Sequence, residues 1–150
     1  MKNIVLFDLD NTIRNMDHRL HYLHRANIDW REFEEQCQYD LPILPTIVMM
    51  RALRTAGKQI WIWTGCSDHV RTMTIAWLHR HQVPYDQLLM KPVAMETTPA
   101  LTLKLRWLKD APVPEDRVIC AFDDDPSVIK GLRKAGLLVY QVVRPDAEEN

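Results

Sequence analysis

The sequence predicts an α/β fold, a mostly parallel five-stranded sheet with helices on both faces. Five short apolar runs are continuous rather than alternating, as in strands buried on both faces, and lie at residues 3–7, 59–63, 87–90, 118–122 and 137–143. Helical patterns separate most of them, at residues 45–56, 68–81, 99–109 and 126–135. Regular alternation of strand and helix is typical of parallel sheets, whose ligand sites lie at the carboxyl ends of the strands.

The predicted helices have recognisable ends. The first begins at Pro45 and stops before Gly57, and the last ends at Gly136. Proline suits the first turn of a helix, and glycine commonly follows the last. The second helix opens on Asp68, whose carboxylate is a suitable N-terminal cap.

Residues 15–44 interrupt this alternation. The segment is too long for an ordinary connection and is rich in His, Arg, Asp and aromatic residues. We expect a small, partly helical, cap-like insert after the first strand, lying over the site. With 150 residues, of which 47% are hydrophobic, the chain can form one domain with a sizeable core, so residues 1–150 are expected to be a single domain.

Composition excludes several classes of protein. A net charge of -1 and a pI near 6.6 are not those of a protein that holds nucleic acid mainly through phosphates. Three cysteines without zinc-site spacing, and a start unlike a signal peptide, indicate a reducing, cytoplasmic setting. No apolar run approaches the roughly 20 residues that span a bilayer. The tail at 146–150 is expected to be disordered.

Polar residues follow three of the predicted strands, and would meet at one edge of a parallel sheet: Asp8, Asp10, Thr64, Asp123, Asp124 and Asp125. So many carboxylates in one pocket need positive charge, and oxygen ligands suit Mg²⁺. Asp8 and Asp10 are two residues apart and would point to the same side of a straight strand, where the two carboxylates would repel each other. The chain must therefore bend there, or one of them must contribute its backbone carbonyl.

These residues fall in recognisable motifs. DLDNT at 8–12 resembles the DxDxT signature of the haloacid dehalogenase (HAD) superfamily, followed in order by WTG at 63–65, a downstream lysine and DDD at 123–125. More narrowly, HR at 18–19, DWREFEEQCQYDLPI at 29–43 and the stretches at 53–78 and 85–91 resemble the 3′-phosphatase domain of phage-type polynucleotide kinase/phosphatases. The resemblance covers nearly the whole chain and implies a Rossmann-like, HAD-like fold.

The resemblance implies a set of catalytic roles. Asp8 would be the nucleophile that forms an aspartyl phosphate. Asp10 would protonate the leaving alkoxide and then activate water. Thr64 would bind the transferring phosphoryl oxygens, although a threonine can also merely end a strand. Lys104 has the spacing of the third-motif lysine and is preferred over Lys91, which directly follows the third strand.

The implied cofactor is Mg²⁺, held by Asp8, the backbone carbonyl of Asp10, Asp123 and Asp124. The alternative for the DDD motif is a group of helix N-terminal acids that the helix dipole favours. Asp125 fits this alternative best, because a third acid more often caps a helix.

Substrate contacts are expected from residues near the motifs: Gly65, Lys91, His18 and Arg19. His18 and Arg19 can equally be one polar face of an exposed helix. In the insert, Trp30 and Phe33 are candidates to stack on a base, although hydrophobic anchoring is the ordinary role. Trp61, Trp63 and Trp77 are predicted to be core.

The pattern departs from the narrower family at four places. Asn11 stands where glycine is usual, and asparagine tolerates the same backbone angles. Cys66 stands where arginine is common after the glycine, and Asp125 where a basic residue is frequent. The stretch TPALTLK at 98–104 lacks the arginine and aspartate that often precede the third-motif lysine. These changes affect substrate binding more than phosphoryl chemistry.

The predicted function is a Mg²⁺-dependent phosphomonoester hydrolase for nucleic-acid 3′-phosphate ends or nucleotides. The alternatives are a HAD phosphatase for an unrelated small metabolite and a catalytically silent metal-binding partner protein. GLRKAG at 131–136 has P-loop glycine spacing, but Leu137 replaces the required lysine, so no kinase domain is expected in this chain.

Overall fold

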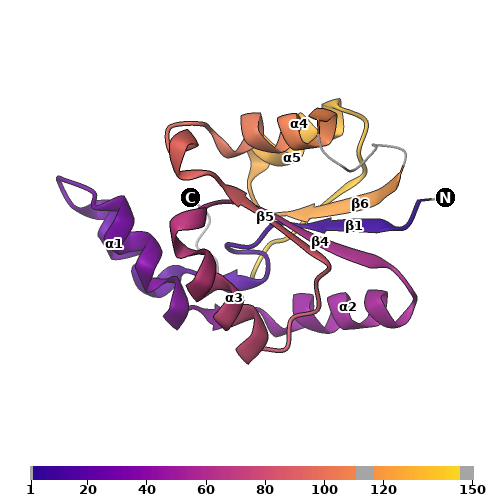
Figure 1. The fold of residues 1–150 in the computed structure, drawn as a ribbon, viewed down its shortest axis with the longest axis horizontal. Coiled ribbons are helices and arrows are strands. Elements are labelled where there is room, and N and C mark those ends of the chain that lie inside the picture. The colour runs from indigo at the N-terminus through magenta and orange to yellow at the C-terminus, as the bar shows by residue number, and fades with distance from the viewer. Residues whose placement is uncertain (1, 111–116, 146–150) are drawn as a thin grey trace.

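A computed structural model describes residues 2–110 and 117–145 and contains the predicted five-stranded parallel sheet (Figure 1). Its order is β5-β4-β1-β6-β7, formed by β1 (Ile4–Phe7), β4 (Gln59–Ser67), β5 (Gln87–Lys91), β6 (Val118–Asp123) and β7 (Val139–Gln141). β1 is central and pairs in parallel with β4 and β6. The carboxyl end of β1 therefore lies between the ends of the two strands that carry the other motifs.

Helices cover both faces of the sheet, as predicted. Figure 1 shows α4 (Ala100–Asp110) and α5 (Pro126–Lys134) on one face, and α2 (Leu44–Thr55) and α3 (Arg71–Arg80) on the other. Each pair of helices packs on its own apolar layer of sheet side chains. The core prediction for three tryptophans is confirmed, since Trp61, Trp63 and Trp77 are at most 6% exposed.

Some predicted boundaries differ from the structure. α3 begins at Arg71 rather than at Asp68, because residues 68–70 form a 3₁₀ turn. The Asp68 carboxylate accepts a hydrogen bond from the Val93 amide at 3.2 Å, so a tertiary contact uses the side chain predicted to cap the helix. Gly57 and Gly136 adopt positive φ angles of 76° and 96° just after α2 and α5, where the sequence placed the helix ends.

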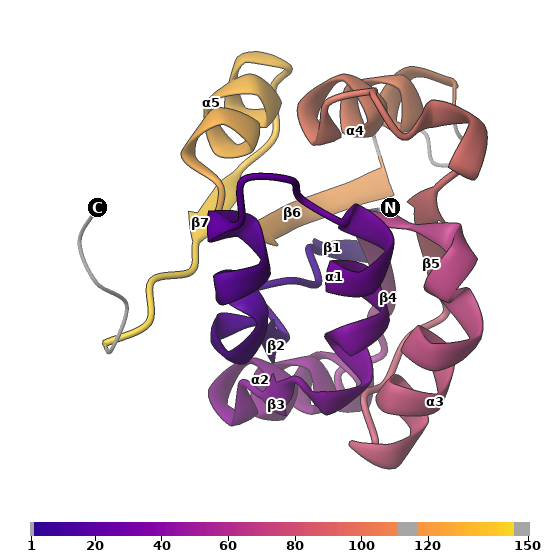
Figure 2. The same ribbon diagram turned by 90° about the vertical axis from the view of Figure 1, so that its left-hand side faces the viewer.

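The insert is partly helical, as expected, and contains a small ribbon that was not predicted. β2 (Arg14–Asn15) pairs antiparallel with β3 (Leu41–Pro42). Between them lie the 3₁₀ helices Asp17–His24 and Gln36–Tyr39 and the short helix α1 (Trp30–Glu35). Figure 2 shows the insert in front of the sheet, at the carboxyl ends of the strands. Two-residue strands are too short to leave a periodic signal in the sequence.

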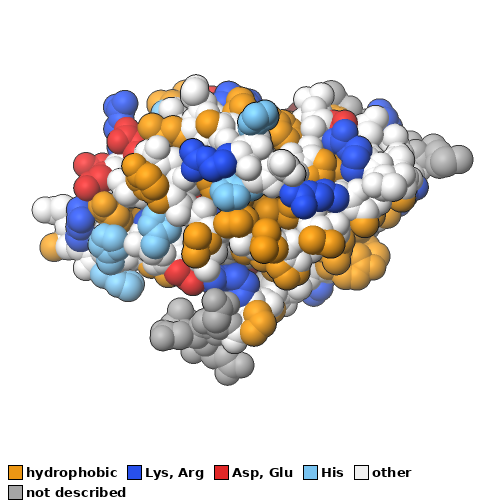
Figure 3. All heavy atoms as spheres, turned by 90° about the horizontal axis from the view of Figure 1, so that it is seen from below, with side chains coloured by type: hydrophobic (Ala, Val, Ile, Leu, Met, Phe, Trp, Pro, Cys, Tyr) orange, Lys and Arg blue, Asp and Glu red, His pale blue; other side chains and the backbone are white. Residues whose placement is uncertain are grey.

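The surface over α2 carries several exposed hydrophobic side chains, among them Leu44, Val48 and Met49, and Figure 3 shows this face with basic residues interspersed. In the parts of the chain that the structure describes, no helix is long and apolar enough to cross a membrane. The predicted disordered tail at 146–150 lies outside the described residues.

Candidate active site

An acidic cluster with one lysine lies where β1 and β6 end. The Lys104 ammonium reaches across from α4 and donates to Asp8 Oδ1 and to Asp123 Oδ2, each at 2.7 Å. Asp8 follows β1, and its amide still bonds to the Phe122 carbonyl of β6 at 2.9 Å. Sheet pairing thus places residues from the two ends of the chain in direct contact with a buried lysine.

Excess negative charge controls protonation in this cluster. Burial, with the charges of Asp123 and Asp124 adding to it, raises the pKa of Asp8 well above its ordinary value, although Lys104 opposes the shift. Burial and the charge of Asp123 raise the pKa of Asp124 to about 6. For Lys104, burial alone would lower the pKa, but the charges of Asp8 and Asp123 outweigh it and raise the pKa. The lysine therefore stays an ammonium.

The acidic cluster fits a hard divalent cation. Asp8, Asp123 and Asp124 each offer a carboxylate oxygen, and these oxygens lie within 4.8 Å of one another. Opposite ligands of Mg²⁺ lie about 4.2 Å apart, because each bond is about 2.1 Å long. The three oxygens therefore lie close enough together for side-chain movements to bring them around one such ion. Asp125 instead caps α5, accepting hydrogen bonds from the Ser127 and Val128 amides.

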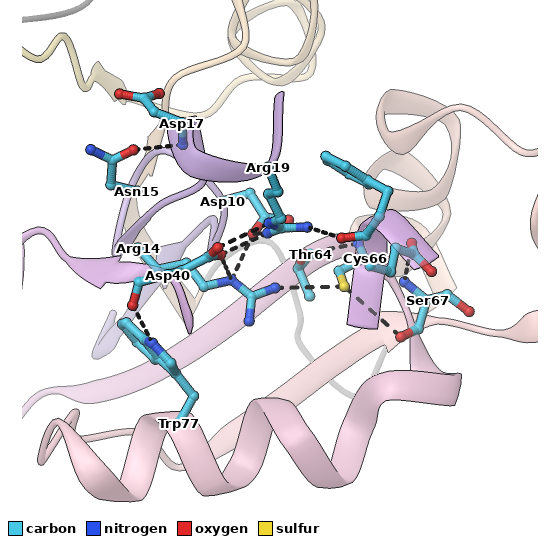
Figure 4. Close-up of polar contacts among 12 residues, drawn as sticks. Asp10, Arg14, Asn15, Asp17, Arg19, Asp40, Thr64, Cys66, Ser67 and Trp77 are labelled. Carbon is cyan, nitrogen blue, oxygen red and sulfur yellow. Dashed lines mark hydrogen bonds and ion pairs between the residues drawn. The ribbon is translucent and has the colours of Figure 1, made fainter. Parts of the chain in front are cut away.

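Asp10 lies in a different environment, an arginine cluster on the insert side of β1 (Figure 4). Its Oδ1 accepts from Arg14 Nε at 2.7 Å and from Arg19 Nη2 at 2.9 Å. Both arginines also contact Asp40, at 3.2 Å from Arg14 and 2.7 Å from Arg19. The indole of Trp77, on α3, donates to the Asp40 backbone carbonyl at 2.8 Å and so holds Asp40 against that helix. Two carboxylates and two guanidinium groups are thus held together.

The arginines determine the charge of Asp10. Burial alone would raise the pKa of Asp10, but the charges of Arg14 and Arg19 outweigh it and lower the pKa. The Asp10 carboxylate is directed at the arginines and is not one of the three carboxylates of the acidic cluster that could hold a metal. A metal contact through its backbone carbonyl stays a prediction.

The backbone of the DLDNT turn explains how neighbouring acids reach different clusters. Asn11 adopts a positive φ of 59°, the conformation that glycine would otherwise supply at this position. The Ile13 amide bonds to the Leu9 carbonyl at 2.8 Å, and the Asn11 amide bonds to the Arg14 carbonyl at 2.7 Å. The chain therefore bends directly after Asp8, as one of the two sequence-based alternatives required.

The segment after Thr64 forms the side of the site opposite the acidic cluster. The Thr64 hydroxyl accepts from the Cys66 amide at 3.0 Å. A Cβ atom on Gly65 would lie 3.0 Å from the Cβ of Ala100, so glycine permits α4 to begin close to this segment. Cys66 is buried, and its sulfur lies 3.6 Å from Arg14 Nη2.

A cavity of about 920 Å³ connects these groups. Among the residues predicted to bind substrate, Gly65, Lys91 and Arg19 line this cavity, together with Trp30 and Phe33 of the insert. His18 does not line it, and its Nε2 lies 2.7 Å from the Asp40 carboxylate. Trp30 is 59% exposed, whereas Phe33 is buried and packs under the Arg19 guanidinium.

Sequence reasoning did not identify Arg14 and Asp40 as site residues. Arg14 lies four residues after Asp10, in the largely polar stretch NTIRNMD at 11–17. The usable signal was its positive charge close in sequence to an acid expected in a pocket, because a buried charge needs a partner. Asp40 gave no such signal, since its partners lie more than 20 residues away in the chain.

Comparison with known families agrees with this geometry. A family model for the polynucleotide kinase PNKP phosphatase domain matches residues 2–146. The chain belongs to this family. It is a HAD-type phosphatase, consistent with a phosphoric monoester hydrolase. No curated protein matches its sequence.

Solved structures share the fold of this PNKP-type phosphatase. A chain of the Pnkp1/Rnl/Hen1 RNA repair complex aligns with a TM-score of 0.80 and 20% identity, over 97% of this chain and 44% of that chain. The present chain thus spans less than half the length of that relative. A predicted phosphatase from Clostridium acetobutylicum aligns with a TM-score of 0.70 and 11% identity, over 94% of this chain and 84% of that chain. A Had-superfamily hydrolase from Ehrlichia chaffeensis aligns with a TM-score of 0.59 and 16% identity, over 94% of this chain and 88% of that chain.

Proposed function

We propose that the protein is a Mg²⁺-dependent phosphomonoester hydrolase that acts through an aspartyl phosphate on nucleic-acid 3′-phosphate ends or nucleotides. The observation that carries this proposal is the contact of Lys104 with both Asp8 and Asp123, each at 2.7 Å. A carboxylate oxygen of Asp124 lies within 4.8 Å of those of Asp8 and Asp123. This arrangement offers a nucleophilic carboxylate, a fixed cation and a ligand set for a metal at one point.

In the first step, an Asp8 oxygen attacks phosphorus and the bond from phosphorus to the leaving oxygen breaks. Lys104 and Thr64 balance and bind the phosphoryl oxygens as charge develops. When bound, Mg²⁺ would be held by Asp8, Asp123 and Asp124 and would neutralise the phosphoryl charge. Asp10 gives its proton to the leaving alkoxide. Because the arginines lower the pKa of Asp10, its protonated form is scarce at neutral pH.

In the second step, Asp10 accepts a proton from a water molecule whose oxygen attacks phosphorus. The bond from phosphorus to Asp8 breaks, inorganic phosphate leaves and the Asp8 carboxylate is restored. The ionised form of Asp10 that Arg14 and Arg19 favour is the form that this step requires.

The substrate class is supported by the family and by the cavity. The chain belongs to a family of polynucleotide kinase phosphatase domains, and a relative in fold occurs in an RNA repair complex. On the cavity wall, the exposed Trp30 ring can stack on a nucleobase, and Lys91 can pair with a further phosphate.

The test is a panel of phosphate esters with purified protein and Mg²⁺. The panel contains a 3′-phosphorylated oligonucleotide, 3′- and 5′-nucleoside monophosphates, p-nitrophenyl phosphate and sugar phosphates, with Asp8→Asn as the inactive control. Preferential release from oligonucleotides or nucleotides supports the proposal. Preference for sugar phosphates indicates a small-metabolite phosphatase instead. No release with Mg²⁺ still bound indicates a silent metal-binding protein.

A further inference from the structure

One carboxylate joins the insert to the end of β4 and the turn that follows it. Glu34 lies on α1, and its Oε1 accepts from the Ser67 amide at 3.1 Å. Its other oxygen, Oε2, lies 3.2 Å from Nδ1 of His69. Ser67 comes three residues after Thr64, and all three residues of this contact line the cavity. Glu34 therefore uses both oxygens to hold α1 against the segment that begins at the proposed phosphate contact.

α1 depends on such contacts for its orientation. The helix has only 6 residues, too few to be stable in isolation. Trp30, Phe33 and Glu34 are spaced at i, i+3 and i+4, so they share one helix face, and all three line the cavity. Phe33 anchors this face in the core, and Glu34 supplies its polar contact.

The Glu34 contact is shielded from water. The side chains of Glu34 and His69 are each 18% exposed. Hydrogen bonds to a charged, partly buried carboxylate contribute more than exposed ones, because water competes less for the donors. Removing the carboxylate would leave the Ser67 amide without its acceptor and α1 free to shift relative to Thr64.

We propose that Glu34 is a positioning residue that sets the distance between the phosphate-binding segment and the wall that contacts the leaving alcohol. The proposal rests on the proposed function, in which this alcohol is a nucleoside. Glu34 does not touch the reacting atoms. It acts through α1, which carries Trp30, and through the Ser67 and His69 side of the cavity.

The structure offers graded substitutions at this contact. Glu34→Ala removes both interactions. Glu34→Gln keeps an oxygen for the Ser67 amide and replaces the oxygen that faces His69 with an amide nitrogen. His69→Asn places an amide nitrogen near the position of Nδ1, so it can keep the bond to Glu34. The matched control is Glu32→Ala, which removes another carboxylate of α1, paired with the exposed Arg25; neither residue lines the cavity.

The experiment measures kcat and KM of each variant for a nucleoside 3′-monophosphate and for p-nitrophenyl phosphate, whose small leaving group demands less of the α1 wall. We expect Glu34→Ala to raise KM for the nucleotide about 10-fold more than KM for p-nitrophenyl phosphate. Glu34→Gln should recover most of this difference, and Glu32→Ala should show none. Thermal melting verifies that each variant is folded.

Two outcomes overturn the inference separately from the proposed function. If the wild type cleaves nucleotides and Glu34→Ala changes both KM values equally, or neither, Glu34 has no positioning role. If Glu34→Gln is as impaired as Glu34→Ala while its melting temperature matches the wild type, retention of the Ser67 bond is irrelevant and the inference also fails. A wild type that cleaves p-nitrophenyl phosphate but no nucleotide overturns the proposed substrate class, and the inference falls with it.

Discussion

The two charged clusters on either side of the β1 end differ in their charge balance. The acidic cluster contains three carboxylates, of Asp8, Asp123 and Asp124, and one cation, Lys104. The arginine cluster contains two carboxylates, of Asp10 and Asp40, and two guanidinium groups, of Arg14 and Arg19. The first has surplus negative charge, whereas the second is neutral overall.

This difference gives two neighbouring carboxylates opposite protonation behaviour. Burial and the surplus negative charge raise the pKa values of Asp8 and Asp124, and a divalent cation would relieve the repulsion there. In the arginine cluster the charges of Arg14 and Arg19 outweigh burial, lower the pKa of Asp10 and fix the direction of its carboxylate. In the proposed mechanism, metal binding and nucleophilic attack therefore belong to the acidic cluster, and proton transfer to the arginine cluster.

The largest expected effect is at the nucleophile. Asp8→Asn removes the attacking oxygen while nearly preserving shape, and we expect turnover of p-nitrophenyl phosphate to fall by at least about 10⁴-fold. Phosphate release under Mg²⁺ saturation measures this effect, and circular dichroism verifies folding. A variant that keeps more than a few per cent of wild-type activity would refute the role of Asp8.

The next effect distinguishes the two candidate lysines. Lys104 contacts both Asp8 and Asp123, whereas Lys91 is the last residue of β5 and lines the cavity wall. Lys104→Met should lower kcat by about 10²–10³-fold, as expected when a group that stabilises transition-state charge is removed. Lys91→Met should act mainly on KM. The reverse result would transfer the charge-neutralising role to Lys91.

A third prediction concerns the stability of the arginine cluster. Arg14→Leu leaves Asp10 and Asp40 with one arginine, and an uncompensated buried charge costs about 3–5 kcal/mol of unfolding free energy. Urea denaturation measures the loss. The control is Arg54→Leu, which removes an exposed ion pair with Asp86 and should cost under about 1 kcal/mol. Similar losses in the two variants would show that burial does not strengthen the Arg14 contacts.

The smallest effect is on stability against pH without metal. The pKa of Asp124 is raised from 3.8 to about 6, so between these values the folded protein binds more protons than the unfolded chain. Stability should therefore rise as pH falls from 7 through this window, by about 1 kcal/mol or about 3 °C in melting temperature. Asp10 does not oppose this rise, because its lowered pKa contributes stability that is lost only below 3.8.

The measurement compares melting temperatures across this pH range in a chelator and in excess Mg²⁺. Bound Mg²⁺ stabilises the folded state, and its binding weakens as the carboxylates take up protons. The melting temperature with Mg²⁺ should therefore lie above that in the chelator at pH 7, and the difference should shrink towards pH 5. Identical pH profiles with and without Mg²⁺ would indicate that the metal does not bind the acidic cluster.

Local and short-range patterns were enough to predict the fold. Continuous apolar runs, the proline in α2 and the glycines after α2 and α5 are read from neighbouring residues, and the structure confirms the sheet and its four covering helices. The same short-range logic explains Asp125, whose carboxylate caps α5 at the residues directly after it. The prediction that Asp68 caps a helix was wrong, because the Asp68 carboxylate accepts a hydrogen bond from the Val93 amide instead.

By itself, the sequence determined the parallel sheet and the edge at which Asp8, Thr64 and Asp123 must meet, because the order of strands and helices fixes where strand ends lie. Only the tertiary structure decided which charges become partners: that Lys104 lies between Asp8 and Asp123, that Arg14 and Arg19 neutralise Asp10 and Asp40, and that Glu34 joins the insert to Ser67. Apart from the contact of Arg14 with Asp10, which spans four residues, such pairings depend on distances of a few ångströms between residues farther apart in the chain, and local sequence patterns do not encode them.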